Sequence, residues 1–322
     1  MAPCAVARSS RAAPAAPVVW RDGVHLTGTP IWCDARRRRD VCFASTADRA
    51  GSGHGQLIAT PTTLAVVGAA SDAGHLAAPL HHPFTLGTLR LELVASGRCL
   101  GAASLHVDAR GRTTLYAGAI RTIDPAPGEL AAEVRACDAL VVAAPFGAPH
   151  HQFQPVAEVA ERVIAWVRAE RAGRRIPTAV VDTPLDGLEL AGHLVGAGLV
   201  VTAGKLVRDA ATRLPDAPKL TASTRDADVI VRTERDRVRV PAPTDGAIAL
   251  VSGRALDAND YALAFAWPFA AGRDELLAWI EQTRARDIYV TGASAEPIAA
   301  ALGPRARVLG PPHQMTLFEA AR

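Results

Sequence analysis

The sequence lacks the cysteine spacing of a disulfide framework and the apolar run of a membrane protein. Its five cysteines are spread from Cys4 to Cys137 without a CxxC pair, and an odd, unpatterned set of thiols favours a reducing compartment. No apolar stretch approaches the ~20 residues of a membrane span, and residues 1–17 lack the apolar segment of a signal peptide. We therefore expect a cytoplasmic protein with no membrane partner, whose residues 1–17 form a disordered leader.

Strong net charge and the common catalytic signatures are also lacking. Charged residues make up 21% of the chain and the formal net charge is +3, which is too little to identify a polyanion partner from whole-chain electrostatics. The sequence contains no Gly-x-Ser-x-Gly elbow, no Walker loop and no Gly-x-Gly-x-x-Gly after a predicted strand. Chemistry must therefore be sought in less regular patterns.

The chain does contain enough apolar residues for a large core, since 49% of its 322 residues are hydrophobic. Its first half is predicted to be mainly β, because apolar residues alternate or run together between turn signals. The predicted strands of this half are residues 88–95, 103–108, 113–117 and 139–144. Gly111 should turn the hairpin between the middle two. A helix is predicted at 61–69, because Thr60 offers an N-cap and Pro61 suits the first turn.

The second half is predicted to be α/β. Apolar residues recur at helical spacing from Val156 to Val167, which predicts a helix that ends before Gly173. Strands and helices then alternate, as in βαβ units. The predicted strands are residues 178–182, 199–202, 247–252, 288–291 and 305–309, and the predicted helices are 186–197, 205–214, 274–283 and 296–302. Asp186 is expected to be a helix N-cap.

Five segments, in sequence order, resemble successive parts of one nuclease family. They are an opening strand pair (24–34), a basic stretch before a metal motif (36–43), the segment after that motif (57–63), a Gly-His-x-x-Gly-Ser-Ala turn (97–103) and a Tyr-Thr-Gly-Asp strand end (115–119). The family is the metallo-β-lactamase/β-CASP nucleases, and the similarity is to its bacterial ligase-associated exonucleases or mRNA 3′-end-processing-like factors.

This resemblance implies an α/β fold with a four-layer αββα metallo-β-lactamase-like sandwich and a partial β-CASP-like α/β insertion. Residues 18–155 and 244–310 would form the sandwich core. Residues 156–243 would form the insertion, and residues 311–322 would be a tail.

The resemblance also implies that the metal-binding residues are lost. Active members hold two metals with a His-x-His-x-Asp-His motif, a later His, a bridging Asp and C-terminal His residues. The corresponding vestigial positions here are Thr46, Asp48, Ala50, Gly51, Arg98, Ala119, Ala270 and Gly292. Among these only Asp48 could ligate a metal, whereas a catalytic ion needs at least three protein ligands to produce hydroxide at neutral pH. Arg98 would place a cation where the metals belong. We therefore expect no catalytic residue, no metal site and no cofactor.

Histidines elsewhere leave an alternative open. The adjacent pairs His81–His82 and His150–His151 lack the spacing usual for ligand pairs and are expected in loops. His54 is the best candidate for a residual ligand. Exonuclease or other hydrolase activity with zinc or manganese would require residues such as Asp48, His54 and His106 to converge in space.

Two further patterns indicate binding rather than catalysis. Arg36, Arg37, Arg38 and Arg39 form a cation run that could contact a phosphate backbone, or could be a solvated loop. Gln314, Met315, Leu317 and Phe318 belong to a pentapeptide similar to the Gln-Leu-x-Leu-Phe motif by which bacterial repair proteins bind the sliding clamp; a tail that packs on its own domain is the alternative.

The hypothesis that accounts for these features is a metal-free, nuclease-like binding or scaffold subunit in nucleic-acid processing or DNA repair. Its expected partners are the sliding clamp, an active nuclease paralogue, a ligase or a helicase, and DNA or RNA. The competing hypotheses are an active exonuclease or hydrolase that uses non-standard ligands, and a remnant without a retained role.

Overall fold

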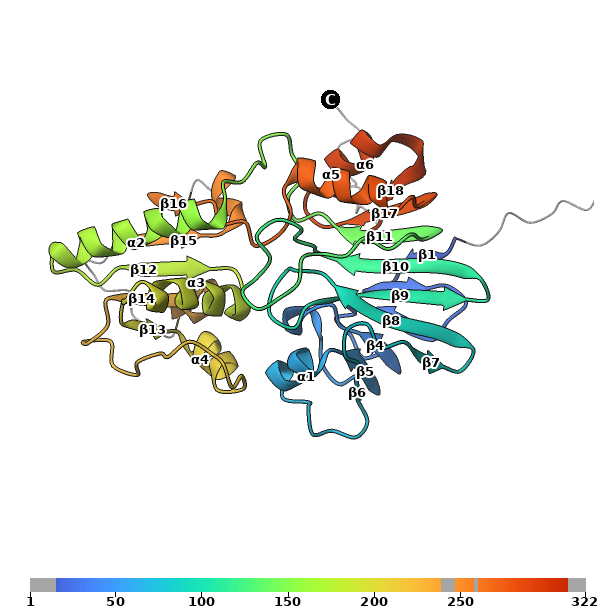
Figure 1. Cartoon of the computed structure of the whole chain (residues 1–322), viewed down its shortest axis with the longest axis horizontal. Helices are drawn as coiled ribbons and strands as arrows, with labels where there is room; N and C mark the ends of the chain where they lie inside the picture. Colours follow the sequence, from blue (N-terminus) through green and yellow to red (C-terminus); the bar gives the residue numbers. More distant parts are fainter. Residues whose placement is uncertain (1–15, 239–246, 258–259, 312–322) are drawn as a thin grey trace, which may run out of the picture.

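The computed structural model describes residues 16–238, 247–257 and 260–311 and forms two adjoining units (Figure 1). The first unit contains a six-stranded and a seven-stranded sheet, and the second contains a five-stranded sheet. The predicted mixed α/β class is therefore confirmed. In these described ranges, no helix combines the length and the apolar character needed to cross a membrane.

The six-stranded sheet is built from the start of the described chain. Its strands, in spatial order, are β1 (Val18–Trp20), β2 (Val24–Leu26), β3 (Ile31–Cys33), β4 (Val41–Phe43), β5 (Gln56–Ala59) and β6 (Leu76–Ala77). Helix α1 (Pro61–Val67) covers its outer face, where Leu64 packs with Cys42 and Leu57. The Thr60 hydroxyl accepts a hydrogen bond from the Thr63 N–H, so the predicted N-cap is confirmed.

The seven-stranded sheet combines distant parts of the chain. Its strands, in spatial order, are β18 (Ala306–Val308), β17 (Asp287–Thr291), β11 (Ala139–Ala143), β10 (Arg112–Gly118), β9 (Ala103–Ala109), β8 (Leu89–Ala95) and β7 (Phe84–Leu86). Strands β10, β11, β17 and β18 are mutually parallel, so their carboxyl ends share one edge. Gly111, with φ +81°, turns the β9–β10 hairpin as predicted.

These two sheets pack face to face. Ile31, Phe43 and Ile58 of the six-stranded sheet share a buried cluster with Leu91 and Leu105 of the seven-stranded sheet. Removal of such side chains from water is the main favourable term in folding. The first unit thus has two central sheet layers.

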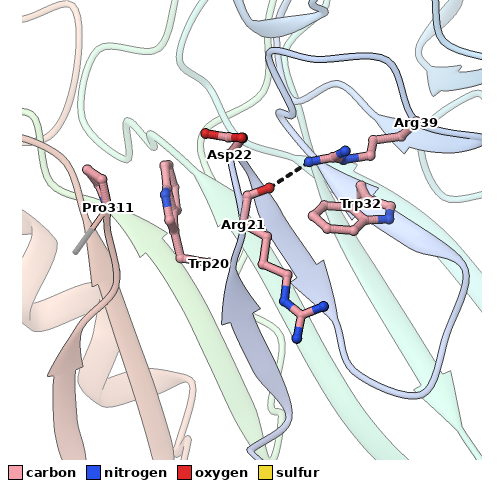
Figure 2. A pocket seen from close by; sticks show the side chains of 6 residues that line it. All are labelled: Trp20, Arg21, Asp22, Trp32, Arg39 and Pro311. Carbon is pink, nitrogen blue, oxygen red and sulfur yellow. Dashed lines mark hydrogen bonds between the residues drawn. The ribbon is translucent and has the colours of Figure 1, made fainter.

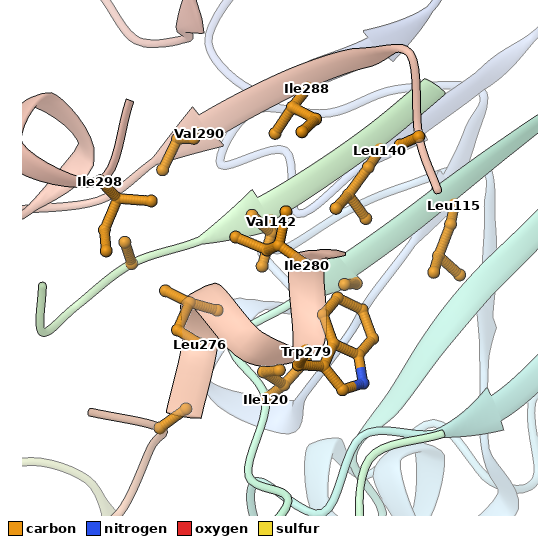
Figure 3. Close-up of a cluster of buried hydrophobic side chains, with 14 of the residues drawn as sticks. Leu115, Ile120, Leu140, Val142, Leu276, Trp279, Ile280, Ile288, Val290 and Ile298 are labelled. Carbon is orange, nitrogen blue, oxygen red and sulfur yellow. The ribbon is translucent and has the colours of Figure 1, made fainter. Parts of the chain in front are cut away.

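Two helices cover the other face of the seven-stranded sheet. These are α5 (Arg273–Gln282) and α6 (Ala295–Leu302). Figure 3 shows Trp279 and Ile280 of α5 and Ile298 of α6 directed toward Leu140 and Val290 of the sheet. The order of layers is therefore α1, sheet, sheet, and then α5 with α6.

The second unit is a parallel sheet with helices. Its strands, in spatial order, are β13 (Val201–Ala203), β14 (Val229–Thr233), β12 (Thr178–Val181), β15 (Ile248–Val251) and β16 (Leu263–Phe265). Its helices are α2 (Val156–Ala172), α3 (Pro184–Gly196) and α4 (Lys205–Ala211). Short 3₁₀ turns occur in both units at Ala47–Arg49 (η1), Glu234–Val238 (η2), Gly253–Leu256 (η3) and Gly303–Arg305 (η4). The predicted apolar stripe of α2, from Val156 to Val167, is buried in this unit.

The predicted boundary of the insertion differs from the structure. Strands β15 and β16 pair with the five-stranded sheet, so this sheet extends to Phe265, well beyond residue 243. A continuous apolar run such as residues 247–252 predicts a buried strand but does not identify the sheet that it joins. The expected leader, residues 1–17, lies outside the described residues except for Ala16 and Pro17.

An apolar contact joins the two units. Val66 of α1 and Cys99 share a buried cluster with Leu185 and Leu188 of α3 and Val207 of α4. The start of α3 therefore lies against the first unit, where the loops that carry the vestigial positions are found.

Candidate functional site

The structure brings the loops that carry the vestigial positions together at one edge of the first unit. These loops follow β4, β8, β10, β16 and β17. The Ser45 carbonyl accepts a hydrogen bond from Ala103 N–H, the Ser96 carbonyl from Arg121 N–H, and the Ile120 carbonyl from Ala271 N–H. Strand-end loops at one edge are a common place for functional residues.

Asp34 anchors this edge. Its carboxylate accepts hydrogen bonds from the Ser45 N–H at 2.8 Å, the Ser45 hydroxyl at 2.6 Å and the Tyr116 hydroxyl at 2.8 Å. Burial raises the pKa of Asp34, and these hydrogen bonds oppose the rise. Asp34 thereby connects the end of β3 to the loop after β4 and to β10. Asp34 lies in the resembling segment 24–34, but no pattern in the sequence predicted this anchoring role.

The side chains at the vestigial positions do not fit a pair of catalytic metals. Ala50 and Ala270 are buried and offer no ligand atom, while Gly51 and Gly292 have no side chain and adopt φ of +61° and +99°. Asp48 does offer a carboxylate. Its side chain is accessible to solvent, and nearby protein atoms partly desolvate the carboxyl group. A tetrahedral zinc site with an open position needs three protein ligands, so this donor set does not support one.

Asp48 has a perturbed environment. Desolvation and the Asp186 carboxylate raise the pKa of Asp48 to about 6, while the Arg98 charge and a hydrogen bond from the Thr183 side chain lower it. The Arg98 cation is thus close enough to Asp48 to act on it electrostatically.

Arg98 forms an ion pair across the two units. Its two terminal nitrogens donate to the two Asp186 oxygens at 2.7 Å and 3.2 Å, and the Asp186 side chain is fully buried. The Asp186 charge raises the pKa of Arg98 against the effect of burial. The prediction that Asp186 caps α3 is wrong, because the Thr183 hydroxyl accepts the Asp186 N–H and leaves the Asp186 carboxylate free for Arg98.

A second ion pair lies beside the first. Arg121 follows β10, and its Nη1 donates to both Glu189 oxygens at 3.0 Å, with both side chains almost fully buried. The Trp267 Nε1 also donates to Glu189 at 3.0 Å. A buried pair of this kind is sensitive to loss of either partner. The sequence contained a signal for these buried ion pairs, because Asp186 and Glu189 are two acids three residues apart on a mostly apolar helix.

Asp48, His54 and His106 have separate surroundings. His54 Nδ1 accepts the Arg39 N–H at 3.1 Å, and desolvation lowers the pKa of His54. The pKa of His106 on β9 is lowered by desolvation, with Glu92 as its main opposing charge. These three residues do not form a potential ligand cluster within the described ranges. His54 is therefore best described as a structural histidine that supports the Arg39 loop.

His150, His151 and Asp257 do form a compact cluster, with potential ligand atoms within 4.8 Å of one another. The predicted loop position of the His150–His151 pair is confirmed. His151 Nδ1 accepts the Gly147 and Ala148 N–H groups at 2.9 Å and 3.0 Å, so its proton lies on Nε2, which donates to Asp257. A histidine ligand needs an unprotonated nitrogen toward the metal. The loop geometry therefore favours a structural hydrogen bond between His151 and Asp257 over a metal site.

Of the two predicted binding segments, the arginine run lies within the described residues and the C-terminal pentapeptide does not. Arg36, Arg37 and Arg38 are exposed in the loop between β3 and β4, and Arg39 is half-buried. Arg37 pairs with Asp22 at 3.3 Å. Gln314, Met315, Leu317 and Phe318 lie outside the described residues.

Comparisons with known proteins identify a fold and no family. No family model matches the chain, and no curated protein matches it. A crystal structure of a protein of unknown function from Enterococcus faecalis V583 is similar, with a TM-score of 0.51 and 11% sequence identity over 84% of this chain and 79% of that chain. At this identity the likeness concerns the fold alone, so the chain shares a mixed α/β architecture with that protein.

Proposed function

We propose that this chain is a metal-free, catalytically inactive relative of the metallo-β-lactamase/β-CASP nucleases that serves as a binding or scaffold subunit in nucleic-acid processing or DNA repair. The layer order of the first unit, helix, sheet, sheet, helices, is that expected of a metallo-β-lactamase-like sandwich. The second unit is inserted between β11 and β17, which agrees with a β-CASP-like insertion. These features support the family assignment, and the site supports the loss of catalysis.

The observation that carries the proposal is the pairing of Arg98 with Asp186 beside Asp48. In the family, this edge would hold two dications. Here a guanidinium occupies the position of a ligand histidine and is already neutralised by a buried carboxylate of α3. A returning metal would meet Asp48 and an Asp186 carboxylate already engaged by Arg98, which is fewer than the three protein ligands that a catalytic ion needs.

The proposal predicts neither stoichiometric metal nor cleavage. Elemental analysis after incubation with zinc and manganese should show no ion bound in stoichiometric amount, because Asp48 is the sole carboxylate among the vestigial positions. Nuclease assays on single- and double-stranded DNA and RNA should show no products.

Asp48→Asn is the matched control for that assay. Cleavage that requires added zinc or manganese and disappears in Asp48→Asn would mean that the chain is an active exonuclease with non-standard ligands, and the proposal would be wrong. Cleavage that persists equally in Asp48→Asn would come from a contaminating nuclease, and repurification should then remove it.

The proposed clamp contact gives a second prediction. Deletion of residues 312–322 should abolish capture by an immobilised sliding clamp and leave the melting temperature unchanged, because a peptide anchor contributes affinity through its own side chains. The paired substitution Leu317→Ala with Phe318→Ala should have the same effect, and Thr316→Ala should have little. Equal clamp retention by the deleted and complete chains would remove the clamp from the proposed partners, leaving a nuclease paralogue, a ligase or a helicase.

A further inference from the structure

A surface depression of about 460 Å³ lies at the turn between β1 and β2 (Figure 2). Its lining combines aromatic and cationic side chains with one acid: Trp20, Arg21, Asp22, Trp32, Arg39 and Pro311. Pro311 follows β18, and Figure 2 shows it beside Trp20, while Trp32 and Arg39 lie on the other side of the turn. The depression therefore joins the edges of both sheets of the first unit.

Arg39 is held in a fixed position at this depression. Its guanidinium carbon lies 3.9 Å from the centre of the Trp32 ring, and its Nη2 donates to the Arg21 carbonyl at 2.6 Å. His25 stacks on Trp32 with ring centres 4.6 Å apart. A planar cation stacked on an aromatic ring loses little further freedom when it binds a ligand.

Cations outnumber acids in the lining of the depression. Arg21 and Arg39 line it, and Asp22, the acid of the lining, already pairs with Arg37. Arg36 and Arg38 are exposed in the loop between β3 and β4. This excess of cations favours an anionic ligand. Trp20 favours a ligand that also has flat faces, whereas the Trp32 ring is already in contact with Arg39 and His25.

We propose that this depression, which we call the Trp20–Arg39 surface, binds single-stranded nucleic acid. A base would stack on Trp20, and the adjoining phosphates would meet Arg21 and Arg39, which line the same depression. Stacking on aromatic rings combined with backbone contacts to arginine is the usual chemistry of single-strand binding, and it works for any base because each has a π face. A duplex offers its phosphates but keeps its base faces stacked internally. The inference rests on the proposed function, since it names the ligand class of the binding subunit.

The test is fluorescence anisotropy of the complete chain with labelled oligothymidylate and oligouridylate of about 15 nucleotides, a length within the usual single-strand site. Trp20→Ala should weaken binding about tenfold or more, the range expected for loss of one stacked base. Trp20→Phe keeps an aromatic face and should retain most of the affinity. Trp166→Ala, which removes a partly buried tryptophan of α2, is the matched control and should bind like the parent.

Arg39→Lys tests whether the fixed position of the Arg39 guanidinium matters in addition to its charge. Lysine keeps the charge and loses the planar contact with Trp32. The substitution should weaken oligonucleotide binding severalfold, and binding of a duplex of equal length should be weak in every variant.

Two results would overturn the inference. Binding that is unchanged in Trp20→Ala and equally tight for a duplex or heparin would show attraction by charge alone. The second result is that a synthetic peptide of residues 312–322 shields Trp20 from a soluble fluorescence quencher while the oligonucleotides do not bind. It would identify the chain's own tail as the occupant. Metal-dependent cleavage together with weaker binding by Trp20→Ala would reject the proposed function and leave this surface in place, so the two failures are distinguishable.

Discussion

Arg121→Ala is expected to lower the free energy of unfolding by about 3–5 kcal/mol, the usual cost of leaving one member of a buried ion pair alone. Both partners are almost fully buried, and the Glu189 carboxylate would keep only Trp267 among the two donors described above. The pair also joins the loop after β10 to α3, so its loss should weaken the contact between the two units. Chemical denaturation followed by circular dichroism measures the effect.

Two variants test the cause of that loss. The double substitution Arg121→Met with Glu189→Gln should recover most of the stability, because it leaves no buried charge and keeps an acceptor for Trp267. Arg171→Ala breaks a partly exposed pair with Asp228 and should cost less than about 1 kcal/mol. A loss for Arg121→Ala no larger than that for Arg171→Ala would show that the inter-unit pair contributes little.

Asp34→Ala is expected to lower the free energy of unfolding by about 3 kcal/mol. The substitution removes three hydrogen bonds to one carboxylate and leaves the Ser45 N–H without that acceptor. Asp34 also has φ +49°, a conformation that aspartate and asparagine tolerate better than alanine. Amide hydrogen exchange should accelerate in residues 44–51, the loop that carries Asp48.

Asp34→Asn is the matched control. It keeps an oxygen for the Ser45 N–H and tolerates the backbone conformation, while the Ser45 and Tyr116 hydroxyls can rotate to accept from the new amide. Its cost should be about 1 kcal/mol. If Asn and Ala were equally destabilising and residues 44–51 exchanged no faster, the anchoring role of Asp34 would be contradicted.

Local chemistry was sufficient to predict most individual elements. Thr60 and Pro61 specify the start of α1, and the apolar stripe from Val156 to Val167 specifies the buried face of α2. The missed strands are β1, β4, β5, β6, β7, β14 and β16. β16 has three residues, too few to show a period of two, and such strands depend on the neighbours with which they pair. The sequence also could not show which sheet β15 joins, because a buried strand has the same apolar pattern in either unit.

The residue types at the vestigial positions specify which donor atoms exist there, so the amino-acid sequence is sufficient to predict that Asp48 is the one carboxylate among them. The partners of the charged side chains, in contrast, depend on the tertiary structure. Arg98 and Asp186 are 88 residues apart, and Arg121 and Glu189 are 68 apart. Electrostatic and hydrogen-bond energies depend on distance in space and on burial, and both are fixed only when α3 packs against the loops of the first unit.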